Sequence, residues 1–283
     1  MDRIKDFDQL RPMSLVSNIS KGYSLAEAMD ITVKAGFNYI EPASIFGVCE
    51  HFLPEQLDEE FAAEFASNLK AKGLNCYAVS GHVDISEEKQ CEDFIKKLQF
   101  AGRIGAKIIN TNSGPIWRRD EFNQSMRKII PVAEKYGVIV GLESHGDIVS
   151  TAKDSGEVFK YFNHELVRMN YDTGNTLFYS EGKAVIENDI LYALEYISYL
   201  HLKDIRIRGN QVEYCALGQG DVNLAAVIKN IKENLTNLPV GLEIPVQIKG
   251  VLGDIRPSQI PLSCEEILAA VDESIGFLAK ISE

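Results

Sequence analysis

The sequence predicts an α/β fold, a (β/α)8 TIM barrel formed by a single domain over residues 1–283. Short apolar runs typical of buried strands alternate with helical patterns along the chain, as in parallel α/β folds. The length of 283 residues and the 45% apolar content suit a barrel, which needs about 250 residues. No linker rich in proline and glycine divides the chain, so we expect one domain.

Eight strand-like runs are expected, in chain order, at 13–17, 39–40 with Glu41 beyond, 75–79, 107–110, 138–143, 167–171, 199–202 and 240–244. Between them, apolar residues recur at helical spacing, as at Phe61, Phe65 and Leu69. Glycines such as Gly36 stand where a helix ends before the next strand. The proline-rich connection 245–261 is long for a compact domain, so we expect a lid, a binding loop or a contact surface there.

An open, doubly wound sheet is the alternative arrangement of eight such strands. That fold predicts a glycine-rich phosphate loop after the first strand, and residues 18–22 do not form one. The barrel is therefore favoured.

The composition excludes several classes of partner. The formal charge of −12 argues against nucleic acid, because phosphate binding needs a basic face. No run approaches the roughly 18 to 20 apolar residues that cross a membrane, and residues 1–8 lack an apolar signal core. The five cysteines show no Cys-x-x-Cys spacing, as expected for free thiols in a reducing compartment. We expect a cytoplasmic protein that binds neither nucleic acid nor membrane.

Four acidic or imidazole residues each follow a predicted strand: Glu143, Asp172, His201 and Glu243. In a barrel, the carboxyl ends of the strands form the rim where active sites are built. Three carboxylates converging there would repel one another unless a cation held them. This oxygen-rich set suits Mn²⁺, Mg²⁺ or Co²⁺, and Zn²⁺ stays open. Taken singly, each residue has a structural alternative, namely an ion pair, a turn cap or a core histidine.

Four segments carry a family resemblance: Gly-Leu-Glu-Ser-His at 141–145, Tyr-Asp-Thr-Gly-Asn at 171–175, Leu-His-Leu-Lys-Asp at 200–204 and Gly-Leu-Glu at 241–243. In this order they resemble the xylose isomerase-like sugar phosphate isomerase/epimerase family, which includes ketose 3-epimerases, hydroxypyruvate isomerases and inosose dehydratases. The resemblance covers nearly the whole chain.

The resemblance implies one divalent metal, Mn²⁺ by preference, bound by Glu143, Asp172, His201 and Glu243. It also implies a carbohydrate substrate and an isomerase or epimerase that abstracts a proton next to a carbonyl through a metal-bound enediolate. Glu143 and Glu243 are the expected acid and base, since carboxylates on opposite faces of a planar intermediate can exchange its proton.

One position departs from the family pattern. Asn175 stands where ketose 3-epimerases usually carry a substrate-binding histidine. Asparagine can hydrogen-bond a substrate hydroxyl, but it cannot transfer a proton near neutral pH. The departure weakens the ketose-epimerase assignment and leaves the metal site untouched.

Three further residues near predicted strand ends are candidates for the mouth of the barrel. His145 lies two residues past Glu143, and is expected either to act as an acid/base or substrate ligand or to pair with Asp147. His82 follows the third predicted strand and is a candidate substrate contact. Glu41 is expected to orient the substrate or a histidine, with an ion pair as the alternative.

Three more candidates are expected to bind substrate. Lys203 shares the direction of His201, and either neutralises a carboxylate near the metal or binds an anionic group. Arg206 is expected to contact a substrate oxygen or phosphate. Trp117, the only tryptophan, forms an apolar wall over a sugar ring or packs within its loop. Without a glycine-rich phosphate cradle, an unphosphorylated sugar or polyol is favoured.

The leading function is thus a divalent-metal-dependent sugar isomerase or epimerase. The alternative is a lyase on the same scaffold, a keto-inositol dehydratase or an enzyme that eliminates a substituent from a 3-keto sugar. That alternative includes a partner subunit docked on the 245–261 segment. We expect a homo-oligomer. An endonuclease IV-like enzyme is disfavoured, because it needs several metals and more histidines than the five present here. A non-enzymatic binding module predicts an incomplete set of metal ligands, which the sequence does not favour.

Overall fold

The computed structural model of the chain describes residues 10–282 and confirms the predicted barrel. Its strands, in chain order, are β1 (Met13–Val16), β2 (Ile40–Glu41), β5 (Ala78–Asp84), β6 (Ile108–Asn112), β7 (Ile139–Glu143), β8 (Val167–Asp172), β9 (Ile197–Leu202) and β12 (Val240–Leu242). All pairings within this sheet are parallel.

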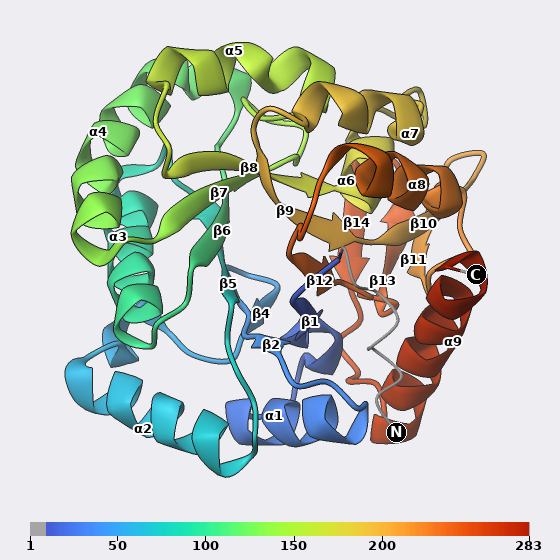
Figure 1. Cartoon of the computed structure of the whole chain (residues 1–283), viewed down its shortest axis with the longest axis horizontal. Helices are drawn as coiled ribbons and strands as arrows, with labels where there is room; N and C mark the ends of the chain where they lie inside the picture. Colours follow the sequence, from blue (N-terminus) through green and yellow to red (C-terminus); the bar gives the residue numbers. More distant parts are fainter. Residues whose placement is uncertain (1–9, 283) are drawn as a thin grey trace.

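The sheet curves until its two edge strands meet. Spatial order runs β2-β1-β12-β9-β8-β7-β6-β5, and two isolated parallel bridges, Tyr39 to Asn75 and Ala43 to Ser80, connect β2 to β5. The barrel is therefore nearly closed, and the carboxyl ends of its strands lie on one rim (Figure 1).

Helices surround the barrel in Figure 1. They are α1 (Leu25–Lys34), α2 (Glu59–Ala71), α3 (Glu88–Arg103), α4 (Arg119–Tyr136), α5 (Ala152–Phe162), α6 (Thr173–Tyr179), α7 (Ile186–Asp189), α8 (Leu224–Asn234) and α9 (Cys264–Ser282), with short 3-10 helices η1 (Ser17–Ser20), η2 (Pro54–Gln56), η3 (Ile116–Arg118) and η4 (Ile190–Ala193). Local sequence sets their ends: Ser24 and Glu27 form a capping box at the start of α1, which satisfies backbone N–H groups there. Among residues 10–282, no helix is both long and apolar enough to cross a membrane.

Two small antiparallel sheets follow the carboxyl ends of barrel strands. The first is the hairpin β3 (Ser44–Ile45) and β4 (Cys49–Glu50) after β2. The second has four strands in the order β10 (Asp204–Arg208), β11 (Gln211–Cys215), β13 (Ile248–Val251) and β14 (Asp254–Pro257). The long connection 245–261 is not an irregular loop, since it folds into the hairpin β13–β14 and extends the sheet begun by β10 and β11.

The third barrel strand is also displaced from its expected place. It runs over Ala78–Asp84 rather than 75–79, and Asn75 makes only an isolated bridge with Tyr39. His82 therefore lies within the strand, not in the loop after it.

A buried lysine ties the β3–β4 hairpin to the outer helices. Lys97 of α3 is 1% exposed, and its ammonium donates a 2.6 Å hydrogen bond to the carbonyl oxygen of Ser44. Burial disfavours the charged form and lowers the pKa of Lys97 to about 8. This contact places β3 beside the rim.

Candidate metal centre

Four side chains meet at the rim where their strands end, as the sequence predicted. Glu143 ends β7, Asp172 ends β8, His201 lies in β9 and Glu243 follows β12. In the parallel register Asp172 stands beside His201, which stands beside Gly241, so the groups occupy neighbouring places on the rim. One ligand atom from each lies within 4.8 Å of the others, and all four residues are buried.

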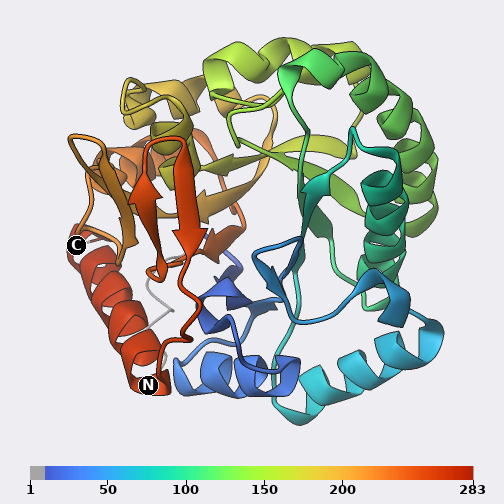
Figure 2. The same ribbon diagram turned by 180° about the vertical axis from the view of Figure 1, so that it is seen from behind.

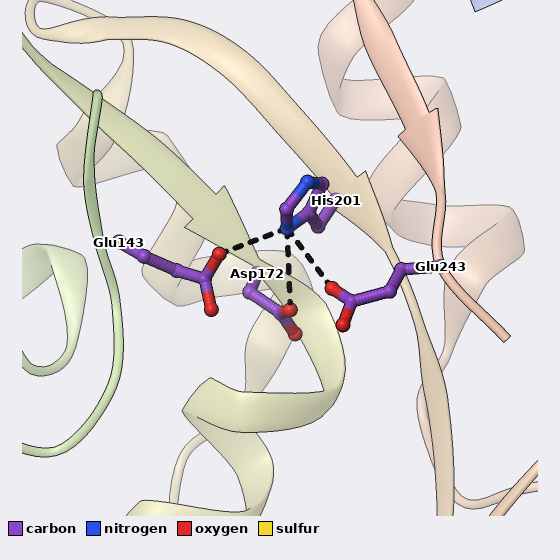
Figure 3. A group of neighbouring side chains, drawn as sticks. All are labelled: Glu143, Asp172, His201 and Glu243. Atoms are coloured by element: carbon purple, nitrogen blue, oxygen red, sulfur yellow. Dashed lines mark ion pairs between the residues drawn. The ribbon is translucent and has the colours of Figure 1, made fainter. Parts of the chain in front are cut away.

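The ligand atoms converge on Nδ1 of His201 (Figure 3). This nitrogen lies 2.9 Å from Oε2 of Glu143, 3.0 Å from Oε2 of Glu243 and 3.7 Å from Oδ2 of Asp172. Glu143 and Glu243 approach from opposite sides, with Asp172 and His201 between them.

The other face of His201 is held by Glu41. Nε2 of the imidazole lies 3.1 and 3.3 Å from the two carboxylate oxygens of Glu41, so Nε2 donates its proton there and Nδ1 is the nitrogen that faces Glu143, Asp172 and Glu243. A carboxylate behind the imidazole is the usual support of a metal-binding histidine. Gly241 leaves room for the pair, because a Cβ there would lie 2.6 Å from Oε2 of Glu41 and 2.7 Å from Cδ2 of His201.

Charge crowding shifts the pKa values of the cluster. Burial opposes the imidazolium of His201, but Glu41, Glu243 and Glu143 together outweigh burial and raise its pKa well above the usual value. For Asp172, burial and the two neighbouring glutamates outweigh the attraction of Lys203, so its pKa is raised. Four buried carboxylates with so little countercharge favour a bound cation.

The residues present fit a divalent ion. Oδ2 of Asp172 and Oε2 of Glu243 are buried and make no hydrogen bond to any described residue. Both lie near the ammonium of Lys203, at 2.8 and 2.9 Å, which forms ion pairs with them. Carboxylate oxygens that face an imidazole nitrogen and share a single ammonium are a hard-ligand set that suits Mn²⁺, Mg²⁺ or Zn²⁺.

Each glutamate has its second oxygen held by an asparagine amide. The Nδ2 of Asn175 donates to Oε1 of Glu143 at 2.8 Å, and the Nδ2 of Asn18 donates to Oε1 of Glu243 at 2.7 Å. His82 lies 2.8 Å from Oε2 of Glu143 through its Nε2. Against the burial that raises it, His82 and His201 hold the pKa of Glu143 well below its usual range. Against the effect of burial, Lys203 and His201 likewise hold the pKa of Glu243 well below its usual range, so both carboxylates are fixed in orientation and ionised.

A cavity of about 220 Å³ opens above these groups. Its polar lining includes both glutamates with His82, His145, Asn18, Asn112, Asn175, Lys203, Tyr179 and Tyr214. Lys203 and Tyr214 both bond Oδ1 of Asn175, at 3.2 and 2.9 Å. Such a convergence of polar groups with perturbed pKa values in a concave site is typical of an active site.

The comparison with protein families gives this site a context. The family model for the xylose isomerase-like TIM barrel matches residues 29–280. The chain belongs to this family. A search of curated proteins finds no match.

Solved structures with the same xylose isomerase-like fold include three informative ones. A xylose isomerase-like TIM barrel protein from Mycobacterium smegmatis in complex with magnesium is 17% identical, with 96% of each chain covered and a TM-score of 0.72. The D-allulose 3-epimerase of Methylomonas sp. in complex with D-allulose is 15% identical, covering 96% of this chain and 97% of that one, with a TM-score of 0.69. AsbF of Bacillus anthracis, a probable 3-DHS dehydratase of petrobactin synthesis, is 20% identical, covering 94% and 98%, with a TM-score of 0.67. At these identities the likeness establishes the fold.

Three predicted substrate contacts of this xylose isomerase-like chain lie away from the cavity. Glu41 is fully buried behind His201, and its carboxylate also accepts hydrogen bonds from Ser80, Asn110 and Tyr199. The structure thus places Glu41 behind the imidazole, where it orients a histidine, one of the two functional roles expected for it.

The other two lie on the outer surface. Arg206 pairs with Glu213 and donates to the carbonyl of Gln219, because alternation along β10 turns its side chain to the outer face of the sheet. Trp117 is 81% exposed in η3, which follows β6, and it does not line the cavity. The structure therefore gives neither residue a place beside the metal centre.

His145 does line the cavity, as expected. Its Nε2 lies 2.9 Å from the hydroxyl of Tyr179, while Nδ1 lies 3.7 Å from a carboxylate oxygen of Asp147. Both roles expected for this histidine are therefore compatible with its position.

Asn18, Tyr179 and Tyr214 line the cavity but are not among the substrate contacts predicted from the sequence. Asn18 follows the first strand and thus carried the same strand-end signal as the metal ligands. Tyr179 ends α6, and Tyr214 lies in β11, which the pattern of barrel strands did not include. These two reach the cavity through elements outside the barrel sheet.

Proposed function

We propose that this protein is a divalent-metal-dependent isomerase or epimerase that moves a proton next to the carbonyl of a polyhydroxylated carbohydrate. The observation that carries the proposal is the pair Glu143 and Glu243, which face each other across Asp172 and His201. Carboxylates on opposite sides of a bound substrate can remove a proton from one face and return one to the other.

The residues that would hold the metal are Glu143, Asp172, His201 and Glu243. When bound, an ion such as Mn²⁺ polarises the substrate carbonyl and acidifies the neighbouring C–H bond. The xylose isomerase-like neighbour from M. smegmatis is in complex with magnesium, and another neighbour, IOLI, binds zinc, which supports a divalent ion here.

The surrounding side chains prepare the two glutamates for proton transfer. The amides of Asn18 and Asn175 fix the carboxylates in place, so little reorganisation is needed during the reaction. Lys203 brings a positive charge beside Glu243 and stabilises negative charge as it develops on a substrate oxygen. The neighbour in complex with D-allulose is an epimerase, which favours a ketose-like substrate.

A second candidate function is elimination on the same scaffold, as in a dehydratase. His145 on the cavity wall is a third acid/base beyond the two glutamates, and imidazole protonates a departing oxygen well near neutral pH. Asn175 in place of a histidine and the probable dehydratase AsbF among the neighbours favour it as well.

The test uses Mn²⁺-loaded protein with ketoses, keto-inositols and 3-keto sugars in D₂O, followed by proton NMR. The proposal predicts deuterium beside the carbonyl together with a new epimer or isomer. Loss of water or of a substituent would instead assign the lyase function. Absence of exchange on every substrate by fully metal-loaded protein would contradict both functions.

One variant separates the two candidates. His145→Gln is expected to leave epimerisation within a fewfold of wild type, because both glutamates remain. If elimination is the reaction, the same change lowers kcat by about 100-fold or more, the usual contribution of a positioned acid. His164→Gln is the matched control, since His164 pairs with Glu134 outside the cavity.

A further inference from the structure

The β13–β14 hairpin turns an apolar face toward the metal centre. Ile248 pairs with Pro257 and Gly250 with Ile255, and cross-strand partners point to the same side of an antiparallel pair. Ile248, Ile255 and Pro257 all line the cavity above the glutamates and are only half-buried. The cavity therefore has an apolar wall that the barrel leaves uncovered.

The opposite face of the same hairpin is charged. Lys249, Asp254 and Arg256 alternate with the cavity-facing residues and are exposed. Because successive side chains of a strand point to opposite faces, the hairpin is amphipathic, with its apolar face on the cavity and its charged face on the outside. A second hairpin, β3–β4, adds Ile45 and Val48 to the cavity lining, and Figure 2 shows both hairpins at the same end of the barrel, β13–β14 in orange-red and β3–β4 in blue.

The apolar wall continues into an adjoining cavity of about 430 Å³. Tyr179 and Ile255 line both cavities, so they form the boundary between them. Phe178 and Leu252 add further apolar surface to the second cavity, beside the carboxylates of Glu181 and Asp254. A molecule longer than one sugar ring would pass between Tyr179 and Ile255 to reach it.

We infer that the substrate is a polyhydroxylated ketone that carries an apolar substituent, aromatic or long alkyl, and that this substituent lies against Ile255 and Tyr179. The inference rests on the proposed function, since it seats the ketone part on the metal centre. Sugar hydroxyls need hydrogen-bond partners when buried, and the isoleucine and proline side chains of the wall offer none. The part of the substrate that covers the wall is therefore apolar.

The experiment compares phenyl and methyl 3-keto-β-D-glucosides as probes of Mn²⁺-loaded protein. Proton exchange in D₂O gives kcat/KM, and calorimetric titration gives Kd for each ketone. We expect the phenyl compound to be favoured at least tenfold in both quantities, because each buried methylene-sized group adds about fourfold in affinity. Equal or weaker binding of the phenyl compound, or no binding of it, overturns the inference.

Two variants locate the effect on the hairpin. Ile255→Thr keeps a β-branched side chain but places a hydroxyl on the wall, and is expected to reduce the phenyl preference about fivefold. Val251→Thr makes the same kind of change on the opposite face of β13 and is expected to keep the preference. If both variants keep it, the apolar wall is not the binding surface and the inference fails.

The outcomes separate the inference from the proposed function. Exchange of both ketones at equal kcat/KM keeps the function and refutes the apolar substituent. Absence of exchange on both ketones counts against the function, and the two Kd values then decide the inference alone.

Discussion

Replacing Lys203 by methionine removes the cation that pairs with two proposed metal ligands. The Lys203 ammonium is buried, 2.8 Å from Asp172 and 2.9 Å from Glu243, and these carboxylates raise its pKa well above normal against the effect of burial. Breaking a buried ion pair by removing one partner costs about 3–5 kcal/mol. We expect the metal-free Lys203→Met variant to lose that much stability, a fall in Tm on the order of 10 °C.

Metal should restore much of this loss. Free Mn²⁺ at 100 times its Kd adds about 2.7 kcal/mol to a protein that binds it only when folded. The gain should be larger in Lys203→Met than in wild type, because the ammonium no longer competes for the two carboxylates. Differential scanning calorimetry with chelator and with Mn²⁺ measures both effects.

A control and a refuting result are available for this prediction. Lys183 pairs with Glu181 at 2.6 Å on the surface, so Lys183→Met should change stability by less than about 1 kcal/mol. If metal-free Lys203→Met is as stable as wild type, or if Mn²⁺ stabilises the two proteins equally, the proposed competition between lysine and metal is refuted.

Three further predictions concern the residues around the centre. Glu41→Gln weakens the support of His201 and should raise the Kd for Mn²⁺ about 10–100-fold by calorimetry, and an unchanged Kd would contradict the role. Asn18→Ala removes the hydrogen bond to ionised Glu243 and should lower the rate of proton exchange about 10-fold or more, with a smaller effect on KM. A change in KM alone, with the exchange rate unaltered, would argue against a role of Asn18 in positioning Glu243. Lys97 has a folded-state pKa of about 8, below its unfolded value, so the unfolded chain binds the proton more tightly. The free energy of unfolding of the wild type should therefore rise by up to ~3 kcal/mol as the pH increases from 8 toward 10.5. Urea unfolding of Lys97→Met should show no such rise.

The barrel and its four rim residues were predictable because both depend on local pattern. A buried parallel strand is a continuous apolar run, and a charged residue at its end marks the rim. Glu143, Asp172, His201 and Glu243 each carry that signal, so their convergence followed from the fold. Asn18 also follows a strand, but it is uncharged, and an amide at such a position has many structural uses.

The remaining features depend on contacts that local pattern does not encode. Strands β13 and β14 are four residues each. Before Pro257 they place only two apolar side chains, Ile248 and Ile255, on the cavity side, which is too few for a recognisable strand pattern. The place of Arg206 depends on alternation within β10, a strand outside the barrel. The inward position of Glu41 depends on partners from three other strands, among them Ser80 and Tyr199.

Calorimetric titration of metal-stripped protein with Mn²⁺ tests the central claim most directly. The account predicts one ion per chain, bound by wild type and lost or weakened at least 100-fold in Asp172→Asn, whose far-ultraviolet circular dichroism should match wild type. Absence of Mn²⁺ binding by wild type, or binding unchanged in Asp172→Asn, would contradict the assignment of this cluster as a metal centre.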